Sequence, residues 1–173
     1  KKPGGIGCDV FIRMELLKSL SEVTAEREFK REDIIKLGLD MCNALELCER
    51  KKIIHRDIKP DNILVNENGD YKLGDFGVAR RLERTSTFMT RRGNQAYMAP
   101  EVYKGERYGI QADIYSLGLV LYRLLNNKRM PFMPPVEEQR YDDGEKALAR
   151  RMRGEKFPLP ANAQDELGKV ILM

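Results

Sequence analysis

The residues best suited to chemistry gather in one segment, residues 55–62, which reads His-Arg-Asp-Ile-Lys-Pro-Asp-Asn. Eighteen residues after Asp57 comes a second acid, Asp75, which opens the triplet Asp-Phe-Gly. Because Mg²⁺ prefers oxygen ligands, the Asp75 carboxylate and the Asn62 side-chain carbonyl could hold that ion while phosphate oxygens complete its shell. Asp57, kept off the metal, could orient a hydroxyl group and accept its proton, and Lys59 would place positive charge where a transferring phosphoryl group gathers negative charge. The set is therefore suited to phosphoryl transfer.

A helix before these residues and a hairpin among them are expected to position them. In residues 32–50 apolar side chains recur at intervals of three, four and seven, which predicts an amphipathic helix with Ile34, Met41, Leu45 and Cys48 on one face. Cys42 lies beside that face and is expected to be a packed core thiol. Residues 62–66 and 71–73 flank Asn68-Gly69, and Asn-Gly in that setting predicts a tight hairpin.

The rest of the chain is expected to be mainly helical. Residues 113–125 are apolar on all sides, which is typical of a helix at the centre of a core. Residues 9–14 alternate as in a short strand, and residues 80–96 show no periodicity, which predicts a long loop. Further helices are expected from Thr24, over residues 146–153 and over residues 165–173. The predicted fold class is α+β, mainly α-helical.

Composition narrows the class of protein. The chain has 173 residues, of which 42% are apolar and 34% charged, enough for one buried core. Its net charge of +4 comes from Lys and Arg spread along the chain, so no nucleic-acid partner is expected. Its three cysteines form no C-x-x-C pair, which indicates a reducing, cytoplasmic setting. No apolar stretch is long enough to span a bilayer, so no membrane contact by this segment is expected; a tether elsewhere in a longer protein stays open.

The order of three motifs resembles the protein kinase family. They are His-Arg-Asp-x-x-x-x-Asn at residues 55–62, Asp-Phe-Gly at residues 75–77 and Ala-Pro-Glu at residues 99–101. The family also has an Asp in its buried central helix, which Asp113 matches, and Lys59-Pro60 is the form typical of its serine/threonine members. The resemblance covers all but the first residues and implies an ATP-dependent serine/threonine protein kinase with protein substrates.

By this resemblance the fold is a protein-kinase-like C-terminal lobe with a small antiparallel hairpin, and the N-terminal lobe is almost entirely missing. Residues 1–17 would be the remnant of the N-lobe, its last strand and the hinge, and residues 18–173 a C-lobe truncated at its C-terminal end. The family's glycine-rich loop and ATP-binding Lys are absent, so this fragment alone is expected to be inactive. Its cut edges, at residues 9–14 and 170–173, are expected to make it self-associate.

The resemblance also implies a role for each site residue. The hinge, residues 14–17, would hydrogen-bond adenine through its backbone. Leu64, which follows the catalytic loop, would form the floor under adenine. The cofactors implied are ATP and Mg²⁺. The candidates are Asp57 and Lys59 for catalysis; Glu15, Leu17, Asn62, Leu64 and Asp75 for ATP; and Asn62 and Asp75 for Mg²⁺.

Other residues acquire roles from the same resemblance. The single histidine, His55, would pack beneath the catalytic loop rather than act as a base or a metal ligand. Arg56 is retained as in kinases activated by phosphorylation of the activation loop, where Thr90 is the first choice of site among Thr85, Ser86, Thr87 and Thr90. Asn94 stands where the family usually has Thr, which leaves full activity open. Asp113 would brace the catalytic loop or cap its own helix.

Several of these residues also admit another interpretation. Gly5-Ile6-Gly7 begins like a phosphate loop, but Val10 stands in place of the third glycine, so a turn is the interpretation. Asp57 and Asp75 could each be ordinary turn residues. A pseudokinase scaffold is disfavoured because the acids, Lys and Asn are intact, and a small-molecule kinase because Ala-Pro-Glu and a long activation loop indicate a protein substrate. The substrate, the organism and the native oligomeric state stay open.

Overall fold

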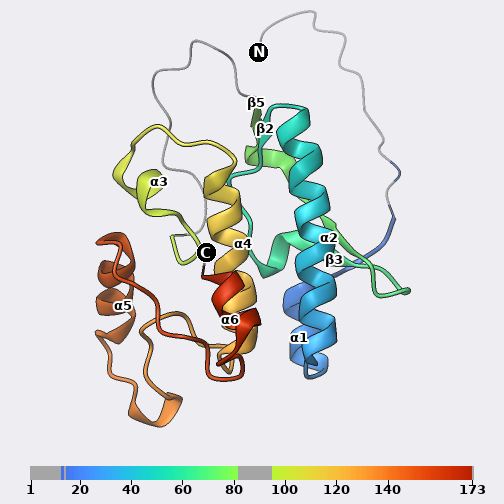
Figure 1. The fold of residues 1–173 in the computed structure, drawn as a ribbon. Helices are drawn as coiled ribbons and strands as arrows, with labels where there is room; N and C mark the ends of the chain where they lie inside the picture. Colours follow the sequence, from blue (N-terminus) through green and yellow to red (C-terminus); the bar gives the residue numbers. More distant parts are fainter. Residues whose placement is uncertain (1–12, 14, 82–94, 173) are drawn as a thin grey trace, which may run out of the picture.

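The computed structural model describes residues 13, 15–81 and 95–172 (Figure 1). Helices dominate this part of the chain, and the strands are short. In chain order the elements are β1 (Lys18–Ser19), α1 (Leu20–Glu26), α2 (Arg31–Arg50), β2 (Ile53–Ile54), η1 (Pro60–Asn62), β3 (Ile63–Val65), β4 (Tyr71–Leu73), η2 (Phe76–Val78), β5 (Arg80–Arg81), α3 (Pro100–Lys104), α4 (Gln111–Leu125), η3 (Val136–Glu138), α5 (Asp143–Met152) and α6 (Glu166–Ile171). The α+β, mainly helical fold class is confirmed.

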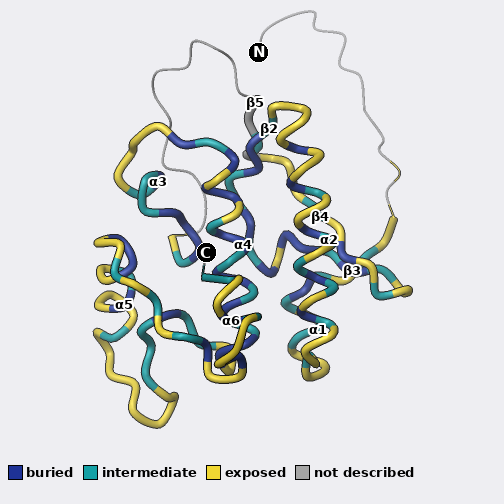
Figure 2. Tube along the Cα trace, in the orientation of Figure 1, coloured by how far each residue is buried: buried dark blue, intermediate teal, exposed yellow. Residues whose placement is uncertain are grey.

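The core is formed where α2 and α4 lie side by side (Figure 1). Leu37, Met41 and Leu45 of α2 and Leu117 and Val120 of α4 belong to one buried cluster. The expected amphipathic face of α2 is thus the face that packs, while the opposite face is exposed to solvent (Figure 2). Burial of this apolar surface is the main term that holds the scaffold together.

The predicted hairpin is confirmed as β3 and β4, which pair antiparallel with Leu64 opposite Lys72. Its turn is closed by Asn66, whose side-chain oxygen accepts the backbone N–H groups of Asn68 and Asp70 at 3.0 and 2.8 Å. Gly69 takes a φ of 77°, a region that glycine enters without cost. β1 joins the other edge of β3, which makes a three-stranded sheet, and β2 pairs with β5 in a second, two-stranded sheet.

Several local predictions were wrong. The stretch expected to begin a helix at Thr24 is instead α1, which begins at Leu20 because Ser19 and Glu22 form a capping box. Cys42 is exposed, whereas Cys48 is buried, since the face of α2 that packs is narrower than the apolar pattern indicated. The predicted strand over residues 9–14 lies outside the described residues except for Arg13.

The later helices are close to their predicted positions. α5 corresponds to the helix expected over residues 146–153, and α6 to the helix expected over residues 165–173. Asp165 caps α6 by accepting the N–H of Leu167 at 3.2 Å. None of the described helices is both long and apolar enough to cross a membrane.

Replacing Leu37 by alanine should destabilise the fold by about 2–5 kcal/mol, because the side chain is fully buried between α2 and α4 and its loss leaves a cavity. Leu39→Ala on the same helix is the matched control, since Leu39 is 62% exposed. Urea unfolding of both variants measures the difference. Equal unfolding midpoints would show that the α2–α4 contact is not the core of the fold.

Candidate active site

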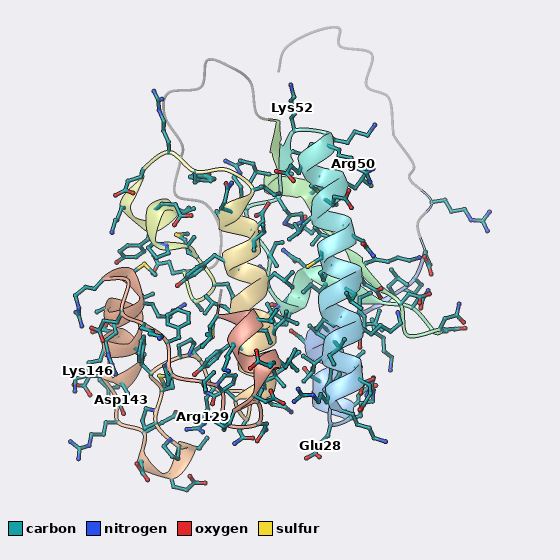
Figure 3. All side chains as sticks on the ribbon, viewed as in Figure 1. Glu28, Arg50, Lys52, Arg129, Asp143 and Lys146 are labelled. Atoms are coloured by element: carbon teal, nitrogen blue, oxygen red, sulfur yellow. The ribbon has the colours of Figure 1, made fainter. Side chains whose placement is uncertain are left out.

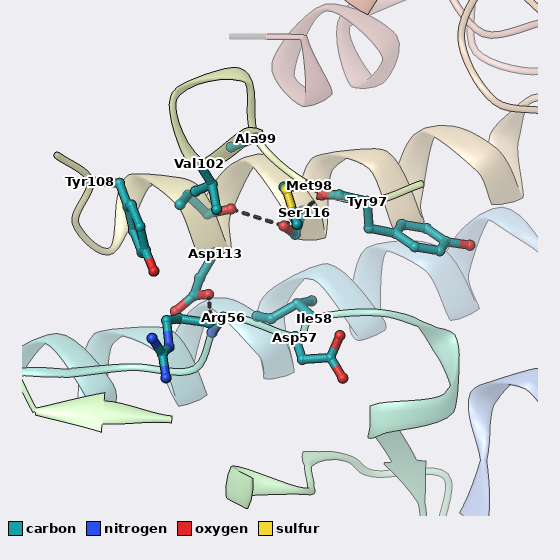
Figure 4. Close-up of a pocket in the computed structure, with 11 residues that line it drawn as sticks. Arg56, Asp57, Ile58, Tyr97, Met98, Ala99, Val102, Tyr108, Asp113 and Ser116 are labelled. Atoms are coloured by element: carbon teal, nitrogen blue, oxygen red, sulfur yellow. Dashed lines mark hydrogen bonds between the residues drawn. The ribbon is translucent and has the colours of Figure 1, made fainter. Parts of the chain in front are cut away.

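The catalytic-loop candidate, residues 55–62, is fixed by a carboxylate from a distant helix. Asp113 of α4 is 1% exposed and accepts the backbone N–H groups of His55 at 2.7 Å and Arg56 at 2.8 Å (Figure 4). Burial raises the pKa of the Asp113 carboxyl, and these two hydrogen bonds act in the opposite direction. Asp113 therefore braces the loop and does not cap its helix, whose N-cap is Ile110.

His55 ties the same loop to the second acidic motif. The ring is completely buried, its Nε2 lies 2.8 Å from the carbonyl oxygen of Gly74, and its edge meets the ring of Phe76 with centroids 4.8 Å apart. A carbonyl only accepts, so Nε2 carries the proton and Nδ1 is left to accept the N–H of Asp57, at 3.4 Å. This surrounded position is that of a structural residue.

Asp57, Lys59 and Asn62 come together as one group. The side-chain nitrogen of Asn62 donates to the backbone oxygen of Asp57 at 2.7 Å and to its carboxylate at 2.8 Å. The ammonium of Lys59 lies 3.0 Å from the same carboxylate oxygen. The Asp57 side chain is 14% exposed and that of Lys59 24%, so the carboxylate is oriented but reachable. Arg56 makes the bend before Asp57 with a φ of 70°.

Asp75 stands at a sharp turn beside this group. Its φ of 53° is left-handed, and its carboxylate accepts the N–H of Gly77 at 3.1 Å. The N–H of Gly74 donates to the backbone oxygen of Asn62 at 2.8 Å, so the two motifs are joined through the hairpin. A Cβ at Gly74 would lie 2.6 Å from Leu64 Cδ1, so a larger residue there would require the Leu64 side chain to shift.

The donor set suits a hard cation that is only partly ligated by protein. The amide nitrogen of Asn62 is committed to Asp57, so its carbonyl oxygen is the end that remains for a metal ion. The Asp75 residue is exposed and offers a carboxylate. Within the described ranges, no three His, Cys, Asp or Glu side chains cluster so as to hold an ion by themselves. Such a site fits Mg²⁺ bound together with phosphate oxygens.

Comparison with known proteins identifies the family. A family description of the protein kinase domain matches residues 8–172. The chain belongs to the protein kinase family. It is 32% identical over 145 residues to the serine/threonine-protein kinase STY46 of Arabidopsis thaliana, and that match covers 83% of this chain and 24% of the relative.

Other relatives come from distant organisms. The probable serine/threonine-protein kinase PknB of Bifidobacterium longum is 36% identical over 70% of this kinase chain and 18% of its own length. The carbon catabolite-derepressing protein kinase of Secale cereale is 30% identical over 91% of the chain and 30% of its own length. The kinase chain thus spans less than a third of the length of these relatives.

The adenine-binding candidates of the kinase chain lie on or next to the three-stranded sheet. Leu17 directly precedes β1, and β1 sets Ser19 opposite Leu64 of β3. Leu64 is half-buried, while its neighbours Ile63 and Val65 point into the core. The Glu15 carboxylate contacts the ammonium of Lys72, so its side chain is occupied. Contact of Glu15, Leu17 and Leu64 with adenine remains a prediction.

Two residues near the catalytic-loop candidate, Ser116 and Tyr97, were not predicted from the sequence. Ser116, almost one turn after Asp113 on α4, lies 2.8 Å from the backbone oxygen of Tyr97 (Figure 4). Tyr97 is buried, and its hydroxyl receives a long hydrogen bond of 3.4 Å from Arg123. A cavity of about 20 Å³, room for about one water molecule, lies between this segment and Asp57. The spacing of three residues on one helix face was the available signal.

Two further predictions lie outside the described residues. These are the phosphorylation sites Thr85, Ser86, Thr87 and Thr90, and the unusual Asn94.

Asp113→Asn should loosen the catalytic loop, because one of the two acceptors for the loop amides becomes an NH₂ group that faces a donor. We expect a loss of about 1–3 kcal/mol in unfolding free energy and faster hydrogen exchange at the amides of His55 and Arg56. Ser116→Ala, on the same buried face, is the control and should leave those two amides protected. Unchanged exchange in Asp113→Asn would contradict the bracing role.

Proposed function

We propose that the protein carrying these residues transfers the γ-phosphate of ATP to serine and threonine hydroxyls of proteins. The observation that carries the proposal is the Asp57 carboxylate, held 2.8 Å from the Asn62 amide nitrogen and 3.0 Å from the Lys59 ammonium. A carboxylate oriented by two donors and still reachable is suited to position a substrate hydroxyl.

Asp57 would receive the proton of the attacking hydroxyl as the new P–O bond forms. Lys59 is placed beside Asp57, where its ammonium can stabilise the negative charge of the phosphoryl group in transfer. Asn62 and Asp75 would hold Mg²⁺, which when bound neutralises charge on the ATP phosphates. The backbone bond from Gly74 to Asn62 keeps these two ligand residues in register.

The choice of serine and threonine is supported by Lys59-Pro60 and by the names of the relatives, which are serine/threonine-protein kinases. Residues 1–17 are proposed to belong to the small lobe and its hinge, and residues 18–173 to the large lobe, with ATP between them. Alone, these residues would lack the contacts to the ATP phosphates that a small lobe supplies, so we propose that they are inactive. A cytoplasmic location for the domain is part of the same proposal, as is self-association of the isolated fragment.

The test is a kinase assay on the full-length protein with radiolabelled ATP, Mg²⁺ and a generic protein substrate, followed by phosphoamino-acid analysis. Asp57→Asn and Asp75→Asn should each lower kcat by at least about a hundredfold without unfolding the protein. Glu67→Gln is the matched control, since Glu67 is exposed in the turn of the same hairpin and its loss of charge should leave kcat unchanged.

Three results would contradict the proposal. Near-normal turnover by Asp57→Asn would remove that residue from catalysis. Label found only on phosphotyrosine would overturn the choice of hydroxyl. Label found on a small molecule and on no protein would favour a small-molecule kinase.

A further inference from the structure

A second cavity, of about 590 Å³, lies away from the phosphoryl-transfer residues, between the end of α4, the loop after it and the end of α5. We name it the α4–α5 pocket. Arg129, which lines it, lies between α5 and the lower end of α4 (Figure 3). Its volume is within the range of ordinary ligand sites. The lining residues used below are Tyr122, Arg129, Phe132, Arg150, Lys156 and Phe157.

The charge of this pocket is of one sign. Arg129, Arg150 and Lys156 line it, and within the described part of the chain no Asp or Glu does. Arg150 is paired with Glu155, which lies outside the lining, through a bond of 2.6 Å. Arg129 and Lys156 form no ion pair with any described carboxylate. The pocket therefore presents positive charge that is only partly compensated.

The apolar wall of the pocket is built from aromatic rings that already contact one another. The ring of Phe157 meets those of Tyr122 and Phe132 edge-on, with centroids 6.1 and 5.6 Å apart. The guanidinium of Arg150 covers Phe132 at 3.9 Å from the ring centroid. The apolar wall is therefore built from rings that hold one another in place, with one face of Phe132 covered by Arg150.

The pocket is also preorganised. Asn126, 7% exposed, accepts the N–H of Ala161 at 3.0 Å and donates to the backbone oxygen of Arg129 at 3.2 Å. The N–H of Asn162 donates to the backbone oxygen of Leu125 at 2.8 Å. These bonds join two loops across one side of the pocket, so a ligand would not have to order them.

We propose that the α4–α5 pocket binds an acidic segment of a partner protein in which carboxylates flank an apolar side chain. The carboxylates would pair with Arg129 and Lys156, and the apolar side chain would pack against Phe157 and its neighbours. A protein segment suits a site that combines partly compensated cations with an apolar aromatic wall. This binding is independent of phosphoryl transfer.

The test uses the full-length protein and a fluorescein-labelled peptide of sequence Asp-Glu-Leu-Phe-Glu-Asp, with binding followed by fluorescence polarisation. The neutral control peptide, Asn-Gln-Leu-Phe-Gln-Asn, should bind at least about tenfold more weakly than the acidic peptide. Added salt should lower the affinity of the acidic peptide. The double variant Arg129→Gln/Lys156→Gln should lose about tenfold in affinity. Lys51→Gln/Lys104→Gln removes the same charge at exposed positions outside the pocket and should bind as the unchanged chain does.

Circular dichroism of both double variants confirms that each is folded, which is expected because all four lysine and arginine side chains lie at or near the surface. The proposal fails if the acidic peptide shows no binding at millimolar concentration, or if the two double variants weaken it equally. It also fails if the neutral control peptide binds as tightly, or if ADP displaces the peptide from the pocket. Since no phosphate transfer is measured, these results stand whether or not the protein proves to be a kinase.

Discussion

The hydrogen bonds from the backbone of His55 and Arg56 to the Asp113 carboxylate are the constraint on which the site depends. A buried charge costs free energy unless donors surround it, and here the donors are the two amides just before Asp57. These hydrogen bonds offset part of the free-energy cost of burying Asp113, and they hold the backbone bend that precedes Asp57. Since Asp113 lies on α4, the position of the loop follows the packing of α4 against α2.

A second set of hydrogen bonds positions the metal-binding candidates, Asn62 and Asp75, relative to the catalytic loop. Gly74 is held twice, by the His55 ring and by the backbone oxygen of Asn62, so that Asp75 begins its turn at a defined place. A side chain at position 74 would force the Leu64 side chain to shift, because a Cβ there would lie 2.6 Å from Leu64 Cδ1. The hairpin and the catalytic loop therefore act as one rigid unit, as a site for phosphoryl transfer requires.

Where a local rule was strong, the sequence predicted the structure well. Asn68-Gly69 gave the hairpin, because few residue pairs adopt that turn. The all-round apolar pattern gave the central position of α4, since such a helix has no face that water would favour. Prediction failed where a helix cap or the width of a packed helix face decided the outcome. Ser19 and Glu22 start α1 earlier than its composition indicated, and Cys42 falls just outside the face of α2 that is covered.

The sequence by itself determined the family and the candidate site residues, because motif spacing and residue chemistry are properties of the chain alone. Only the tertiary structure decided which of several possible partners Asp113 takes, that Ser116 holds Tyr97, and that Arg129, Arg150 and Lys156 share one pocket. Such groups join residues that are far apart in sequence. Their meeting depends on how each helix is rotated in the core, and that rotation is set by packing over the whole fold rather than by any local pattern.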